Sequence, residues 1–105
     1  MPKYLVQGSY TDQGLKGLLN EGGSKRRMMV EKLAEEIGGK LDVFYFAFGS
    51  DDFVIILDLP SNIDMAATAI VAQASGMVKS RVTVLMDPKD VDQAVQRRVD
   101  FRPPS

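Results

Sequence analysis

Residues 41–59 read LDVFYFAFGSDDFVIILDL and decide the fold, because they contain two strand-like stretches joined by a tight connection. The stretches are Leu41–Phe48 and Phe53–Leu59, and Gly49–Asp52 connects them. Both are apolar on each face instead of alternating apolar with polar residues. A small antiparallel sheet normally leaves one face to water. We therefore expect a second copy of the chain to cover one of the two faces.

The segments around this pair predict the class of the fold. Strand composition occurs at Tyr4–Tyr10 and at Lys79–Met86. Four helical stretches are expected: a short one capped by Thr11 or Asp12, one from Ser24 to Gly38-Gly39, one from Ser61 or Asn62 to Ser75, and one starting at Asp87-Pro88. The order β-α-β-β-α-β plus a terminal helix predicts a ferredoxin-like α+β fold with a four-stranded antiparallel sheet.

The apolar spacing also predicts which side of each helix is buried. The inward residues are expected to be Met29, Val30, Leu33 and Ile37 in the long helix, Ile63, Ala67, Ile70, Val71 and Ala74 in the alanine-rich helix, and Val91, Ala94 and Val95 in the last helix.

The hairpin register predicts two apolar faces of the sheet and therefore association of the chain with a second copy. If Phe48 pairs with Phe53, one face carries Phe44, Phe46, Phe48, Phe53, Ile55 and Leu57, and the other carries Leu41, Val43, Tyr45, Ala47, Val54 and Ile56. Burial of each such side chain contributes roughly 1.5–3 kcal/mol. If one face stayed exposed to water, on the order of 10 kcal/mol of burial free energy would be lost, which is comparable with the stability of a whole domain. We therefore expect a homodimer, or a higher assembly, that packs sheet against sheet.

Composition limits the classes of function. The 105 residues form one expected domain, residues 1–96, followed by a charged, proline-containing tail, residues 97–105. The net charge of −1 gives no basic field for nucleic acid or an anionic membrane. No apolar run reaches the roughly 20 residues of a membrane span. With no cysteine and no histidine, we expect a cytoplasmic protein without a metal or cofactor.

Arg26 is the first candidate for ligand binding. It follows Gly22-Gly23 near a helix start and lies three and four residues before the apolar Met29 and Val30, so its side chain is expected to point inward. Free backbone amides at such a start suit an anion. The alternative is structural, with the stem of Arg26 covering the core and its charge in water.

Tyr10, Tyr45 and Asp58 form the second candidate set. In the assumed register Tyr45 shares a face with Asp58, and a tyrosine with a carboxylate could orient a small molecule or move a proton. The alternative places Asp58 in water at the strand end and Tyr45 in the core with its hydroxyl at the rim. Asp51 and Asp52 are explained by turn chemistry, since their spacing is unlike that of a calcium loop.

Several segments together resemble the GYD-domain family: MPKYLVQGSY at 1–10, GLKGLL at 14–19, EGGS at 21–24, GGKL at 38–41 and FYFAFG at 44–49. A tyrosine and an aspartate follow the hairpin glycine in that family. Gly49 and Asp52 match, but Asp51 stands where the tyrosine is expected. The resemblance implies a place in the dimeric α+β barrel superfamily, which packs two ferredoxin-like sheets face to face. It implies no activity.

Three functions remain open from the sequence. The first is a homodimer that binds a small apolar or aromatic molecule in a cleft between sheet and helices, with Tyr10, Arg26, Tyr45 and Asp58 as polar anchors. The second is a cofactor-independent monooxygenase or isomerase of the dimeric α+β barrel type, in which Asp58 would be the proton acceptor. The third is a structural or regulatory module whose last helix and tail reach a partner.

Overall fold

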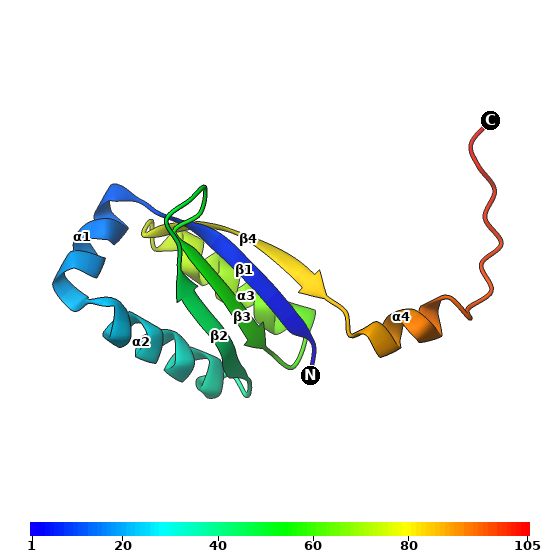
Figure 1. Cartoon of the computed structure of the whole chain (residues 1–105), viewed down its shortest axis with the longest axis horizontal. Coiled ribbons are helices and arrows are strands. Elements are labelled where there is room, and N and C mark those ends of the chain that lie inside the picture. Colours follow the sequence, from blue (N-terminus) through cyan, green and yellow to red (C-terminus); the bar gives the residue numbers. More distant parts are fainter.

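The computed structural model describes all 105 residues and shows one four-stranded antiparallel sheet with four helices (Figure 1). The elements are β1 Lys3–Tyr10, α1 Asp12–Glu21, α2 Gly23–Glu36, β2 Lys40–Phe46, β3 Phe53–Asp58, α3 Asn62–Ala74, β4 Val78–Leu85 and α4 Pro88–Ala94. The strands lie in the order β2-β3-β1-β4, and the sheet is open. This confirms the predicted α+β class and the ferredoxin-like order. No helix combines the length and the apolar character that crossing a bilayer requires.

Three of the four helices begin as their capping residues predict. The side chains of Thr11, Ser61 and Asp87 each accept a backbone N–H from the first turn of α1, α3 and α4. The start of α2 differs, because no side chain caps it and the prediction of Ser24 as its cap is wrong. Gly22 instead adopts a left-handed φ of 84°, which lets α1 end and α2 begin across a single residue.

The strand pairing between β2 and β3 ends two residues before the expected position, so the connecting loop is longer than predicted. Phe46, not Phe48, pairs with Phe53, so the assumed register is wrong by two residues. The reason is Asp52, whose backbone N–H and carboxylate make two hydrogen bonds to β1 of 2.7 and 3.0 Å. These bonds hold the start of β3 against β1 and leave residues 47–52 as a loop.

A β-bulge at the start of β2 moves one residue to the other face. The register shifts between Leu41 and Val43, so Leu41 pairs with Leu57 and packs against the core. The prediction that put Leu41 on the same face as Val43 is therefore wrong. A bulge inserts one extra residue and so inverts the alternation of the side chains beyond it.

Both faces of the sheet carry apolar side chains, as the sequence predicts. The helix side faces α2 and α3 and holds the buried core, which consists of Tyr4, Val6, Ala34, Phe53, Ile55, Leu57, Leu59, Met65 and Val78. The open side is the opposite face, and the register gives it Leu5, Val43, Tyr45, Val54 and Ile56. No element of the same chain covers these five residues (Figure 1).

Helix α3 turns a different stripe to the sheet from the one predicted. Met65 is buried and Ala69 and Ala72 pack against the core, whereas Ile63 and Ile70 are 81% and 68% exposed. The hydroxyl of Tyr4 donates a 2.6 Å hydrogen bond to the side chain of Asn62, the first residue of the helix. This bond fixes the rotation of α3 about its axis. In α2 the buried residue is Ala34, while the predicted Met29 and Leu33 are partly exposed.

The C-terminal arm, residues 86–105, leaves the body of the domain (Figure 1, orange to red). Every residue in it is exposed, including Val91 and Val95, which were predicted to face inward. That prediction is wrong within a single chain because α4 continues away from the end of β4 instead of folding back. The arm extends the molecule to 54 Å along its longest axis.

Candidate ligand-binding site

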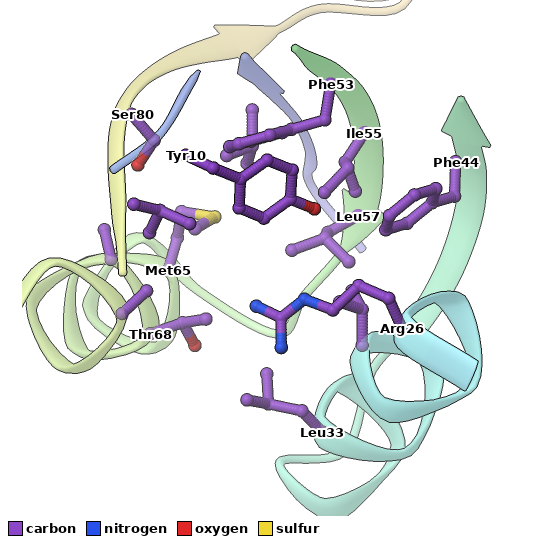
Figure 2. Close-up of a pocket in the computed structure, with 15 residues that line it drawn as sticks. Tyr10, Arg26, Leu33, Phe44, Phe53, Ile55, Leu57, Met65, Thr68 and Ser80 are labelled. Atoms are coloured by element: carbon purple, nitrogen blue, oxygen red, sulfur yellow. The ribbon is translucent and has the colours of Figure 1, made fainter. Parts of the chain in front are cut away.

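The main cavity lies between the helix side of the sheet and helices α2 and α3 (Figure 2). Its volume is about 110 Å³, and 12 of its 15 lining residues are hydrophobic. Such a lining suits an apolar group with only a few points of polar contact. An apolar cavity of about 150 Å³ is known to hold benzene. This one is smaller but open on one side, so it can take about one small ring.

The cavity exists because the two helices stay apart above the sheet. Helix α3 presents the small Ala69 and Ala72 to the space, and α2 presents Val30 and Leu33. Figure 2 shows Leu33 facing α3 across the gap. Above the cavity a groove of about 520 Å³ runs between α2 and α3, and Leu33 also lines this groove. A ligand can therefore reach the cavity from the surface between the two helices.

Arg26 supplies the only charged side chain of the cavity. In Figure 2 its guanidinium extends from the first turns of α2 into the space between the helices. It makes no ion pair, although the neighbouring Arg27 pairs with Glu31 at 3.2 Å. Arg26 is half-buried and has the hydroxyl of Tyr10 as a polar neighbour. No carboxylate neutralises its charge, which can therefore attract an acceptor atom of a ligand.

Tyr10 lies at the end of β1 and forms a second polar point of the cavity wall. Its ring packs against Phe53, with 5.3 Å between the ring centroids, and lies 6.5 Å from Phe46. Burial raises the pKa of the Tyr10 hydroxyl above its usual value, although the charge of Arg26 acts in the opposite direction. The hydroxyl is therefore protonated at neutral pH and can donate a hydrogen bond.

The structure does not bring Tyr45 and Asp58 into this cavity. Both belong to the opposite face of the sheet, where Tyr45 pairs with Val54 and Asp58 pairs with Lys40. Four residues of strand separate these two pairs, which corresponds to about 13 Å. Tyr45 is 70% exposed, and neither residue lines the cavity. Of the four predicted ligand anchors, only Tyr10 and Arg26 lie together.

Asp58 is held at the end of the sheet by lysines. It is buried, and its carboxylate pairs with Lys3 at 2.8 Å and with Lys40 at 3.6 Å. Lys3 donates hydrogen bonds to Asp58 and to Asp42, and these bonds raise the pKa of Lys3, the one to Asp58 most. The group ties β1, β2 and β3 together, which fits the structural interpretation of Asp58 at a strand end. Lys3 was not singled out from the sequence, because a lysine near the N-terminus has no local signal.

The two aspartates of the hairpin loop have structural partners. Asp51 accepts two hydrogen bonds of 2.9 Å from Arg81 of β4, and this guanidinium lowers the pKa of Asp51. Asp52 is tied to β1, as described above. The acidic side chains form no group of three that could hold a metal ion.

Glu21 is a residue of the site that the sequence did not indicate. It ends α1, and one of its carboxylate oxygens is buried without any hydrogen-bond partner. It lines a second cavity of about 110 Å³, next to the first, and Tyr10 and Arg26 line both. A glutamate at the polar end of a short helix resembles an ordinary surface residue, so only the three-dimensional arrangement identifies it.

The fold and the cavity define a small α+β protein with ferredoxin-like topology and an apolar space between its sheet and its helices. A comparison with protein families matches residues 4–95 to the GYD domain. The chain therefore belongs to the GYD-domain family, as the sequence segments predicted. Searches of curated proteins and of solved structures gave no match.

Proposed function

We propose that this chain forms a homodimer that binds a small apolar or aromatic molecule in the cavity between the sheet and helices α2 and α3. The observation that carries the proposal is an apolar cavity with one unpaired cation, Arg26, in its wall. Empty apolar space forfeits packing contacts. A ligand that fills the space restores these contacts and gives the guanidinium an acceptor.

The position of Asp58 favours a binding function over a catalytic one. A cofactor-independent monooxygenase or isomerase would need a proton acceptor that reaches the substrate. No carboxylate lines the main cavity, and Asp58 is paired with two lysines on the other face of the sheet. Tyr10 does line the cavity, but its raised pKa makes it a hydrogen-bond donor at neutral pH.

The dimer is supported by two surfaces that the single chain leaves uncovered. One is the open side of the sheet with its five apolar residues. The other is the C-terminal arm, in which α4 has only seven residues and no buried side chain. An isolated helix of that length is unstable in water, so the arm also calls for a partner surface. A second copy of the chain supplies both, and a different protein bound to the arm is the alternative.

A cavity-filling substitution tests the binding site. Ala69→Leu places extra carbon atoms in the cavity wall, and Ala66→Leu adds the same atoms at an exposed position of the same helix. In a titration with toluene followed by NMR, we expect the natural chain and Ala66→Leu to bind, and Ala69→Leu to lose at least tenfold in affinity. Equal binding by both variants would remove the cavity from the proposal.

A further inference from the structure

The second cavity points to the chemistry of the ligand. We propose that the polar end of the ligand binds between Glu21, Arg26 and Tyr10, and that this end both accepts and donates hydrogen bonds, as a carboxamide does. The inference rests on the proposed function, because the apolar part of the same ligand would occupy the main cavity.

The two cavities are neighbours with a shared wall. The second one lies where β1, α1 and α2 meet, and its lining consists of Tyr10, Gly14, Gly17, Leu18, Glu21, Arg26 and Met77. Tyr10 and Arg26 also line the main cavity. To occupy both, a ligand with its ring in the main cavity would extend a substituent past these two side chains into the second one.

Two opposite charges border the second cavity, and neither makes an ion pair. A carboxylate oxygen of Glu21 is buried and accepts no hydrogen bond, and Arg26 makes no ion pair. An unsatisfied buried acceptor is costly, more so when it is charged. The two groups do not satisfy each other, since their nitrogen and oxygen atoms lie beyond the 4.0 Å of an ion pair. A group placed between them that donates to Glu21 and accepts from Arg26 would satisfy both.

This arrangement selects one class of polar group. The carbonyl oxygen of a carboxamide can accept from the guanidinium of Arg26 and from the protonated hydroxyl of Tyr10, while its NH₂ donates to Glu21. A carboxylate has no proton to donate and would lie beside a like charge. A methyl group satisfies neither side chain. The ligand class is therefore a small ring that carries a neutral donor–acceptor group.

The space for this group can be closed without changing either charge. A Cβ atom built at Gly17 meets no atom within 4 Å, so the cavity is open at this position. The variant Gly17→Leu would fill the second cavity and leave the main one unchanged. It should weaken binding of benzamide and have little effect on binding of toluene.

Three probes on one ring test the inference with the full chain: toluene, benzamide and benzoate. By calorimetric or NMR titration we expect benzamide to bind at least tenfold more tightly than benzoate, because a hydrogen bond to a charged group is worth about that factor. Glu21→Gln should bring the ratio of the two affinities close to one. Arg26→Gln should weaken benzamide about tenfold, and the adjacent Arg27→Gln should not, since Arg27 lines neither cavity.

Each outcome separates this inference from the proposed function. If toluene binds and benzamide binds no more tightly than benzoate, the main cavity stands and the polar site is overturned. An unchanged benzamide-to-benzoate ratio in Glu21→Gln also overturns it. If benzamide binds and toluene does not, the polar site stands and the apolar cavity falls. Failure of all three probes to bind overturns both.

Discussion

The two faces of the sheet differ in the kind of partner they lack. On the helix side α2 and α3 cover β1 and β3, while Val82 and Val84 of β4 stay 37% and 54% exposed. Between the helices and the sheet lies a partly open cavity of about 110 Å³ with Arg26 and Tyr10 in its wall. On the open side no helix covers the apolar strip, in which Tyr45 is 70% exposed and the other four residues are partly exposed. Charged pairs lie at its margins: Asp58 with Lys3 and Lys40, and Asp51 with Arg81.

This difference indicates two separate kinds of contact. A small concave space of about one ring suits a small molecule, whereas a flat strip with a charged border suits another folded surface. The paired charges at the border are already satisfied within one chain, so they do not oppose an approaching copy. Arg26 on the helix side makes no ion pair, so its charge is available to a ligand.

The largest effect, loss of the dimer, is expected when a charge is placed on the open side of the sheet. Ile56→Asp would bury an unpaired carboxylate between the two sheets, which typically costs several kcal/mol. Sedimentation velocity at micromolar concentration should show the natural chain as a dimer and this variant as a monomer. The control is Val71→Asp, which puts the same charge on the exposed surface of α3, where Val71 is 67% exposed.

The control separates an interface from a general loss of solubility or folding. Val71→Asp should remain dimeric. If both variants remain dimeric, the open side is not the interface, and if the natural chain is itself a monomer, the dimer proposal fails.

A smaller effect is expected at two glycines of α1 that border the second cavity. A Cβ at Gly14 would clash with the carbonyl oxygen of Met77, so Gly14→Ala should lower the free energy of unfolding by about 1–3 kcal/mol. Gly17 faces open space, and Gly17→Ala should raise stability by about 0.5–1 kcal/mol, because alanine is the better helix former. Urea denaturation measures both. Equal effects of the two substitutions would contradict the close packing at one position and the cavity at the other.

The smallest effect concerns alkaline pH on the helix side. Burial raises the pKa of Tyr10 above 10.0 in the folded chain. The folded state then holds the phenolic proton more tightly than the unfolded state, so stability decreases as the pH rises above about 10. The variant Tyr10→Phe should show a shallower loss of stability over that range in denaturation curves. Identical pH profiles for the variant and the natural chain would show that the tyrosine is not buried as described.

Much of the fold could be predicted because its signals are local. The order of strands and helices follows from glycine and proline breaks and from capping residues such as Thr11, Ser61 and Asp87. The two apolar faces of the hairpin follow from residues 41–59 alone. The pairing register of the hairpin could not be predicted from these residues, because it depends on hydrogen bonds between Asp52 and β1, which is about forty residues away in the chain.

The candidate site was predicted only in part for the same reason. Arg26 was expected to point inward from its helical spacing, and the structure places it in the cavity wall. The predicted role of Asp58 and Tyr45 as ligand anchors depended on the assumption that their face of the sheet borders the cleft. The lysines that pair with Asp58 come from β1 and β2. Glu21 becomes notable only because its carboxylate oxygen is buried without a partner, a property that no sequence pattern contains.

Native mass spectrometry of freshly purified protein tests the central claim most directly, because it reports assembly and retained ligand together. The account predicts an ion of twice the 11.6 kDa of one chain, with an added small-molecule mass that disappears in Ala69→Leu. A bare 11.6 kDa monomer, with no added mass in the presence of toluene or benzamide, would contradict the assignment of different partners to the two faces of the sheet.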